Sequence, residues 1–342
     1  MTALNGNADA SHILATGLRD RWYGVCPSDF VPTGGMRQLR RLDHDWILFR
    51  EPDGTLRMLE NRCPHRGAPL SEGVHLGDRI QCLYHGVQVN GEGTVITVPG
   101  MPGCNLEGKT LVRSLPVHEI GGAILAYFGN DVNAEPCQLD LPEPLTDPDI
   151  SSFLCYAEWD TPWRFAIENL LDPMHGAFLH RESHTMYAGD TSAQFRIRET
   201  ERGFVFEKTT QQGLNFDWVE FIHSGMDWVR LEIPYPPSAG PGGPFGIVGL
   251  TTPITPKKSA VFFWRYRNVQ GWQRDLWRFL YKTTIERRHW DVLEQDRAML
   301  EAMAADADQA ENLYSHDLGI VRVRRLFRQI AERQSEGPAA RS

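Results

Sequence analysis

The segment CPHRGAPLSEG at residues 63–73, followed by CLYHG at residues 82–86, contains two pairs of potential metal ligands. The four side chains are Cys63, His65, Cys82 and His85. Each pair places a thiolate and an imidazole on one short segment, and sixteen residues separate the two pairs. Two tight loops of this kind can together close a site with four ligands. The pattern therefore predicts a small domain whose loops hold a metal cofactor.

Two thiolates and two imidazoles suit either a tetrahedral zinc ion or a 2Fe–2S cluster in which two His replace two Cys at one iron. Zinc fingers usually place both Cys before both His, whereas here each loop carries one of each. Gly67 and Gly86 permit tight turns that aim backbone N–H groups at cluster sulfurs. The two segments resemble the Rieske family, with a zinc loop as the alternative. Neither has the extra Cys of the cytochrome-complex proteins, which favours the oxygenase or ferredoxin type.

The composition is that of an ordinary soluble protein with a substantial core. The chain has 342 residues, 41% hydrophobic and 23% charged, which suggests two or three domains or one large one. A formal net charge of −9 without a basic stripe argues against a nucleic-acid surface. No apolar run approaches the ~20 residues that span a bilayer, and the N-terminus lacks the pattern of a secretory signal. The six cysteines include no other paired spacing, so we expect reduced thiols in the cytoplasm.

The order of strand-like and helix-like patterns predicts two domains after a flexible N-terminus. We expect a flexible segment at residues 1–17, a small all-β domain at residues 18–130 and an α+β domain at residues 131–335. The second domain would have a central antiparallel sheet flanked by helices. Within it we expect a linker over residues 131–150, helices over residues 163–182 and 272–305, strands over residues 193–268 and a mobile loop at residues 236–246.

A second group of candidate ligands lies in the segment NLLDPMHGAFLH, which begins at Asn169. Asn169, Asp172 and His175 follow one another at three-residue intervals and would share one face of a helix. Pro173 disfavours helical geometry at the residue before it, so we expect a kink or an irregular turn that brings His180 round to the same site. Two His and one carboxylate form the facial triad of non-heme Fe(II) oxygenases, which leaves coordination positions open.

Asp296 is the candidate for the carboxylate of this triad. At 100° per residue it lies in the middle of the apolar stripe of the long helix expected near the C-terminus. That stripe comprises Ile285, His289, Val292, Leu293, Met299, Leu300 and Met303. A carboxylate on a buried face is costly unless it is paired or metal-bound, and an internal arginine is the alternative partner. Asp172 is better suited to accept the imidazole N–H of His175 and so fix its tautomer.

Together with EQDRAMLEA at residues 294–302, these motifs resemble the catalytic subunit of Rieske non-heme iron oxygenases, over nearly the whole chain. The resemblance implies a Rieske 2Fe–2S cluster and a mononuclear Fe(II) bound by His175, His180 and Asp296. The layout is similar to that of the phthalate oxygenase and the vanillate or dicamba demethylase branch. It implies that O2 and electrons are used to hydroxylate, or to O- or N-demethylate, an aromatic or other ring-containing small molecule.

The same resemblance implies an electron route and partners. Asp172, with Asn169 beside it as a second candidate catalytic residue, would bridge His175 to a cluster histidine, His85, of a neighbouring subunit in a homotrimer. A flavin-containing reductase, with or without a ferredoxin, would supply the electrons. We expect neither a nucleic-acid nor a membrane partner.

Two alternatives stay open at this point. One is a Rieske electron carrier whose second domain only binds a partner, and it predicts no mononuclear iron and no oxygen consumption. The other concerns the basic segment at residues 320–330, which is either an ordinary solvated helix face or a docking surface for an acidic ferredoxin or reductase. For that segment, Arg324 and Arg325 are the residues whose charge reversal would distinguish the two.

Overall fold

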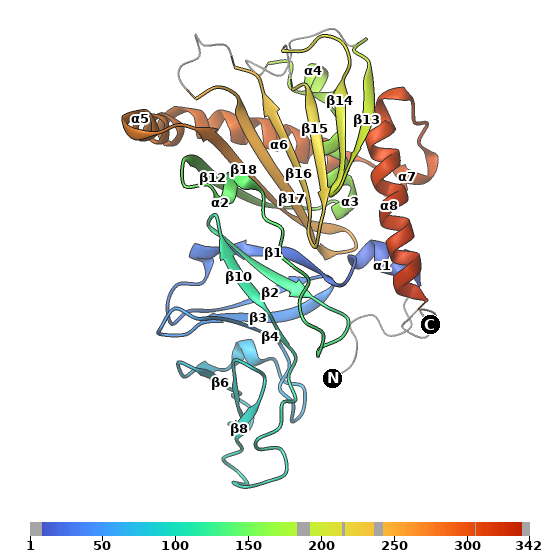
Figure 1. Ribbon diagram of the computed structural model, residues 1–342. Helices are drawn as coiled ribbons and strands as arrows, with labels where there is room; N and C mark the ends of the chain where they lie inside the picture. Colours follow the sequence, from blue (N-terminus) through green and yellow to red (C-terminus); the bar gives the residue numbers. More distant parts are fainter. Residues whose placement is uncertain (1–8, 183–191, 214–215, 236–241, 305, 337–342) are drawn as a thin grey trace. The chain divides into compact units, whose positions relative to one another are not determined.

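The computed structural model of the chain describes residues 9–182, 192–213, 216–235, 242–304 and 306–336 (Figure 1). The chain forms two compact units, each with its own internal contacts. The first unit comprises residues 1–137, 252–256 and 334–342, and the second comprises residues 138–251 and 257–333. The change of unit after residue 137 falls slightly later than the expected boundary after residue 130.

The described residues of the first unit form three small sheets and one short α-helix. The strands are β1 (Arg21–Pro27), β2 (Met36–Arg41), β3 (His44–Arg50), β4 (Leu56–Glu60), β5 (Val74–His75), β6 (Arg79–Gln81), β7 (Gln88–Asn90), β8 (Val95–Thr97), β9 (Ser114–Leu115), β10 (Val117–Ile120) and β11 (Ala123–Phe128). They form sheets in the orders β1-β11-β10, β2-β3-β4-β9 and β5-β6-β7-β8. Three short turns connect antiparallel neighbours: Asp53-Gly54 lies between β3 and β4, Asn90-Gly91 ends β7 before β8, and Gly121-Gly122 lies between β10 and β11.

The N-terminal segment is more ordered than expected. Residues Ala10–Thr16 form helix α1, so the expectation of flexibility over residues 1–17 is wrong for this part. Asp9 explains where the helix begins, because its Oδ1 accepts the backbone N–H of His12 at 2.7 Å. The preceding residues 1–8 lie outside the described part of the chain.

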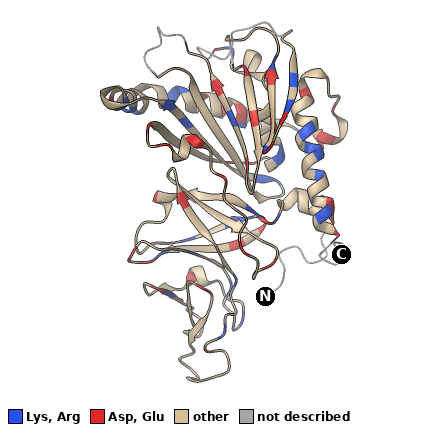
Figure 2. Ribbon diagram, in the orientation of Figure 1, with Lys and Arg blue, Asp and Glu red and all other residues tan. Residues whose placement is uncertain are grey.

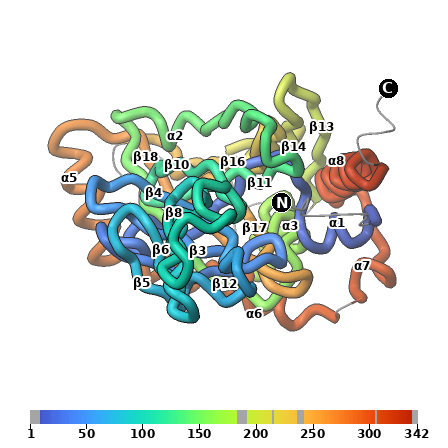
Figure 3. Tube along the Cα trace, turned by 90° about the horizontal axis from the view of Figure 1, so that it is seen from below, coloured from blue at the N-terminus to red at the C-terminus, as the bar shows by residue number. Residues whose placement is uncertain are grey.

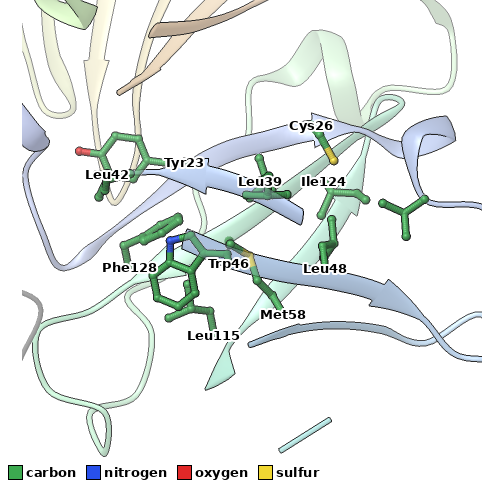
Figure 4. Close-up of a cluster of buried hydrophobic side chains, with 13 residues drawn as sticks. Tyr23, Cys26, Leu39, Leu42, Trp46, Leu48, Met58, Leu115, Ile124 and Phe128 are labelled. Carbon is green, nitrogen blue, oxygen red and sulfur yellow. The ribbon is translucent and has the colours of Figure 1, made fainter. Parts of the chain in front are cut away.

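Figure 4 shows the core cluster between the sheet of β1 and β11 and the sheet of β2, β3 and β4. Trp46 is fully buried and meets Phe128 edge to face, with ring centroids 5.5 Å apart. Its indole N–H donates to the Arg41 carbonyl at 3.1 Å, so the polar atom of this large side chain is satisfied. Truncating such a residue to Ala typically costs about 3–5 kcal/mol. This core fixes the sheet β2-β3-β4-β9, and the first Cys–His segment follows β4 directly.

The second unit is built on one seven-stranded sheet. Its strands are β12 (Ile150–Trp159), β13 (Phe195–Thr200), β14 (Gly203–Lys208), β15 (Trp218–His223), β16 (Asp227–Ile233), β17 (Phe245–Thr255) and β18 (Lys258–Asn268). They lie in the order β12-β18-β17-β16-β15-β14-β13, and all neighbours with a described register run antiparallel. The expected central antiparallel sheet is therefore confirmed. Six residues of the expected mobile loop, 236–241, lie outside the described residues.

The described residues of the second unit also form several helices. They are α2 (Glu143–Thr146), α3 (Trp163–Leu171), α4 (His175–Leu179), α5 (Gly271–Leu280), α6 (Glu286–Ala302), α7 (Ala307–Ala310) and α8 (Leu318–Ser335). Helix α3 contacts α6 and strands β15, β16 and β18. Figures 1 and 3 both show α5 at the β12–β18 end of the sheet and α8 beside β13 at the other end. None of the described helices is both long and apolar enough to cross a membrane.

Two expected segments of the second unit differ from the structure. The linker expected over residues 131–150 contains α2, and it leads into the strand β12, which the sequence pattern did not reveal. The long helix expected over residues 272–305 is interrupted by a π-helical turn at Tyr281–Ile285. Tyr281 is fully buried there, and its ring stacks on Phe153 with centroids 4.0 Å apart. A π turn of this kind inserts one extra residue into an α-helix.

Candidate metal centres

The two Cys–His segments form matching loops. The first follows β4, and the second joins β6 to β7. In each loop the cysteine carbonyl accepts a hydrogen bond from the glycine four residues later, from Gly67 N–H to Cys63 O and from Gly86 N–H to Cys82 O, both at 2.9 Å. The two glycines have φ values of +75° and +72°, a region that other residues seldom adopt. The tight turns expected from the sequence are therefore present.

The side chains of these loops differ sharply in burial. Cys63 and Cys82 are 3% and 1% exposed. His65 and His85 lie at the surface, with ring centroids 4.5 Å apart. Burial raises the pKa of the Cys63 thiol to about 11, and the neighbouring Cys82 thiol adds to this effect. Two buried sulfurs and two adjacent exposed imidazoles fit a 2Fe–2S cluster whose His-ligated iron faces the surface, where electrons can reach it.

In the second unit, His175, His180 and Asp296 converge from different segments. His175 begins α4, His180 directly follows that helix, and Asp296 lies on the buried face of α6. One ligand atom of each residue lies within 4.8 Å of the other two. The Oδ1 atom of Asp296 is 3.1 Å from His180 Nε2 and 3.5 Å from His175 Nε2. Two imidazoles and one carboxylate at this spacing can bind a single metal ion and leave part of its coordination sphere open.

The interruption between two helices at Pro173 creates this geometry. Helix α3 ends at Leu171, and Asp172 has an extended backbone with ψ of 110°. The expected departure of Asp172 from helical geometry is therefore confirmed, and it divides residues 163–182 into two separate helices and does not merely kink one. Proline lacks the backbone N–H that would continue the helix, and it disfavours helical geometry at the residue before it.

Asp296 is buried as the sequence predicted, with 6% of its surface exposed. Its ion-pair partners among the described residues are the two histidines, so the alternative of an internal arginine finds no support. The expected apolar stripe is wrong at its C-terminal end, because Met299 and Met303 are 53% and 42% exposed. The buried residues of α6 are Leu293, Asp296 and Leu300, so the stripe that surrounds the carboxylate is narrower than expected.

Asp172 lies beside His175 as expected. Its Oδ2 atom is 3.5 Å from His175 Nδ1, and its Oδ1 atom accepts the backbone N–H of Met174 at 2.8 Å. Burial alone would lower the pKa of His175, but the carboxylates of Asp172 and Asp296 outweigh it and the net pKa is raised. Burial likewise opposes ionisation of Asp172, yet its interactions with His175 lower its pKa. The two carboxylates make the site electronegative, which suits a cation.

Two amide side chains complete the surroundings of the three residues. The Nδ2 atom of Asn169 donates to Asp296 Oδ1 at 3.4 Å, a long hydrogen bond. The Oε1 atom of Gln295 lies 2.8 Å from His180 Nδ1. Sequence reasoning identified Asn169 but missed Gln295. A glutamine next to an aspartate on a helix carries no signal of its own, because a contact with His180 depends on where the break at Pro173 places that histidine.

Two family models match the chain in succession. The Rieske [2Fe-2S] domain matches residues 21–116, and the vanillate O-demethylase oxygenase C-terminal domain matches residues 159–333, which is more than half of the chain. This chain is a Rieske oxygenase. Its cofactors are a Rieske 2Fe–2S cluster and a mononuclear non-heme iron, so the zinc-loop alternative does not hold. The first match ends at residue 116 and the second begins at residue 159, and the change of compact unit after residue 137 lies between them.

Curated relatives of this Rieske oxygenase include several oxygenase components. The toluene-4-sulfonate monooxygenase system iron-sulfur subunit TsaM1 of Comamonas testosteroni is 26% identical over 83% of this chain and 87% of its own length. The oxygenase component of dicamba O-demethylase from Stenotrophomonas maltophilia is 31% identical over 48% of each chain. For that demethylase and several other relatives, the matched region spans about half of the relative or less.

Solved structures show the same fold over nearly the whole chain. The oxygenase in a complex with ferredoxin from carbazole 1,9a-dioxygenase has a TM-score of 0.73 at 21% identity, covering 96% of this chain and 92% of that one. Dicamba monooxygenase bound to 3,6-dichlorosalicylic acid has a TM-score of 0.72 at 21% identity, covering 93% and 98%. The expected fold class, an all-β Rieske domain followed by an α+β domain, is confirmed.

Two of the four arginines in the basic segment at residues 320–330 form ion pairs within the chain. Figure 2 shows the row of cationic residues along α8. Arg324 binds both Glu168 on α3, at 2.6 Å, and Glu311, while Arg322 pairs with Glu199 at 2.8 Å. Arg324 is therefore engaged in contacts within the chain. A docking surface for an acidic partner would have to use exposed residues such as Arg325.

Proposed function

We propose that this Rieske oxygenase is the terminal component of a multicomponent system, and that His175, His180 and Asp296 bind its mononuclear iron. The proposal rests on one observation: these three side chains bring their donor atoms within 4.8 Å of one another in the domain that matches the oxygenase family. We assign the cluster to Cys63, His65, Cys82 and His85. Two buried sulfurs and two exposed imidazoles on matched loops support this assignment.

The residues around the iron ligands have distinct tasks in this proposal. Iron held by two His and one carboxylate supplies open coordination positions for dioxygen chemistry. Asp172 orients the His175 ring through Nδ1 and provides a carboxylate between this unit and the cluster histidine His85 of a neighbouring subunit. Asn169 holds the Asp296 carboxylate in place through Oδ1, at 3.4 Å. In this proposal the two contacts orient His175 and Asp296 toward the metal.

The substrate in this proposal is an aromatic or other ring-containing small molecule that is hydroxylated or O- or N-demethylated. The names of the relatives support this class, because they include oxygenase components for toluene-4-sulfonate, dicamba and vanillate. We propose a homotrimer in the cytoplasm that receives electrons from a flavin-containing reductase, with or without a ferredoxin. A structural neighbour solved as an oxygenase–ferredoxin complex supports a ferredoxin donor.

The alternative, a Rieske electron carrier without oxygen chemistry, is disfavoured by the second unit. A domain that only bound a partner would have no need for two histidines and a carboxylate converging in its interior. The match to an oxygenase C-terminal domain over residues 159–333 points the same way.

Iron and acid-labile sulfide per chain test the proposal directly. Anaerobically purified protein should contain about three irons and two sulfides per chain, with the EPR signal of a reduced Rieske cluster. His175→Ala and His180→Ala should each lose one iron and keep both sulfides. Two irons per chain that do not increase after addition of Fe(II) would instead favour the electron carrier.

A further inference from the structure

We propose that Gln295 is a positioning residue that sets the tautomer of His180 and thereby the affinity of the mononuclear site for its metal. This inference rests on the proposed function, since it takes His180 as an iron ligand. Gln295 directly precedes Asp296 on α6, so one helix would supply both a metal ligand and the residue that orients a second ligand, His180. Asp296 would bind the metal directly, and Gln295 would act through His180.

The hydrogen bond between the two side chains carries the argument. His180 Nδ1 lies 2.8 Å from Gln295 Oε1, and His180 is only 1% exposed, so water does not compete for this nitrogen. A neutral imidazole has one N–H and one lone pair. Because an amide oxygen can only accept, Nδ1 must carry the proton, and the lone pair is left on Nε2. That is the nitrogen 3.1 Å from Asp296 Oδ1, where the ligand atoms converge.

The two histidines of the site are therefore held in different ways. His175 has the carboxylate of Asp172 next to its Nδ1, at 3.5 Å. His180 has a neutral amide at a shorter distance, 2.8 Å. A carboxylate makes an imidazole a stronger donor and attracts its proton, whereas an amide fixes the ring with less effect on its charge. Asp172 and Asp296 already place two carboxylates in the site. Gln295 orients the second imidazole without adding a third negative charge.

The role of the amide also predicts which replacements are tolerated. Gln295→Met keeps the length of the side chain and removes the strong acceptor, so either tautomer of His180 becomes accessible and the ring is free to turn. Gln295→Glu keeps an acceptor at the same position. Loss of such a supporting contact typically lowers metal affinity about 10–100-fold. We expect a loss of that size for Gln295→Met, and for Gln295→Glu an affinity at least equal to that of the wild type, because a carboxylate makes the imidazole a stronger donor.

Co(II) binding measures this effect without turnover. Protein with its cluster intact and its mononuclear iron removed by a chelator is titrated with Co(II) in competition with a chromophoric chelator. The EPR spectrum of bound Co(II) reports the ligand geometry while the oxidised cluster is EPR-silent. Met299→Glu controls for the added charge of Gln295→Glu, because it places a carboxylate about one turn further along α6 at an exposed position. Thermal unfolding controls for the fold.

The outcomes separate this inference from the proposed site. Failure of the wild type to bind one Co(II) per chain, or full binding by His180→Ala, would overturn the proposed iron site. A wild type that binds and a Gln295→Met variant with the same affinity and the same Co(II) spectrum would overturn the role of Gln295 and leave the site intact. Weaker binding by Gln295→Met, restored by Gln295→Glu but not improved by Met299→Glu, supports it. If Gln295→Met loses its cluster, Gln295→Asn, which shortens the amide, takes its place in the same comparison.

Discussion

At the scale of single residues, Asp172 combines two contacts that would serve different purposes. Its Oδ1 atom accepts the Met174 N–H at 2.8 Å and fixes the chain after the helix break, while Oδ2 faces His175. Replacing Asp172 by Asn retains the first contact and removes the charge. We therefore expect Asp172→Asn to keep both metals but to transfer electrons between them much more slowly. Single-turnover oxidation of the reduced cluster in the presence of substrate measures this rate, and turnover at the wild-type rate would contradict the bridging role.

A second residue-scale prediction concerns His289 on α6. Burial and, to a lesser degree, the charge of Arg265 lower the pKa of His289 to about 3, and its Nδ1 has no hydrogen-bond partner among the described residues. In the unfolded chain this pKa is about 6.5. As the pH falls below ~6.5, the unfolded chain takes up a proton that the folded chain does not, so stability is lost by at most about 1.4 kcal/mol per pH unit.

Replacing His289 by Phe removes this contribution and keeps a ring against Phe245, whose centroid is 4.6 Å from that of His289. Between pH 7 and pH 5, the wild type should lose about 2 kcal/mol more of its free energy of unfolding than His289→Phe. Urea unfolding at the two pH values gives this difference. Equal losses in the two proteins would show that the pKa of His289 is not lowered in the folded state.

At the scale of elements, α8 is attached to α3 by a buried ion pair. Arg324 contacts both carboxylate oxygens of Glu168, through Nε at 2.7 Å and Nη2 at 2.6 Å, and Glu168 is 6% exposed. Removing the arginine leaves an uncompensated charge in the interior, which typically costs about 3–5 kcal/mol. We expect Arg324→Met to lower the midpoint of thermal unfolding by roughly 10 °C.

Arg322→Met is the matched control for this change on the same helix. Its partner Glu199 is well exposed, with 60% of its side chain accessible, and such surface pairs contribute at most about 1 kcal/mol. A similar, small effect of both substitutions would mean that Arg324 does not stabilise the contact between α3 and α8. Because α3 ends next to Asp172, a large effect of Arg324→Met should be accompanied by weaker metal binding.

Sequence periodicity predicted those elements whose signals are local. The Cys–His loops follow from spacing and two glycines, and Asp296 follows from its place among apolar residues on one helix face. Strand β12 was missed because its sequence alternates weakly, with a buried Ser151 among its inward residues. The π turn was missed because no local pattern marks it; its first residue, Tyr281, stacks on Phe153, which lies 128 positions earlier in the sequence. The contact between Gln295 and His180 was likewise beyond reach, since tertiary packing alone creates it.

At the scale of the whole molecule, the two sets of candidate ligands belong to different compact units. The cluster residues lie in the first unit, which has its own buried core around Trp46, and the iron residues lie in the second, on the seven-stranded sheet and its helices. A metal site contributes its binding energy to the unit that holds its ligands. The loss of one cofactor should therefore leave the other in place.

Two substitutions test this independence. We expect His175→Ala to lose the mononuclear iron and retain the visible absorption and EPR spectrum of the Rieske cluster. Cys82→Ser should lose the cluster and still bind one Co(II) per chain at the second unit, because none of the contacts of His175, His180 and Asp296 described above involves the first unit. Metal analysis and Co(II) titration of both variants measure the two outcomes. Loss of Co(II) binding in Cys82→Ser would show that the second unit needs an intact cluster domain to assemble its iron site. That result would contradict the prediction that the two cofactor sites form independently.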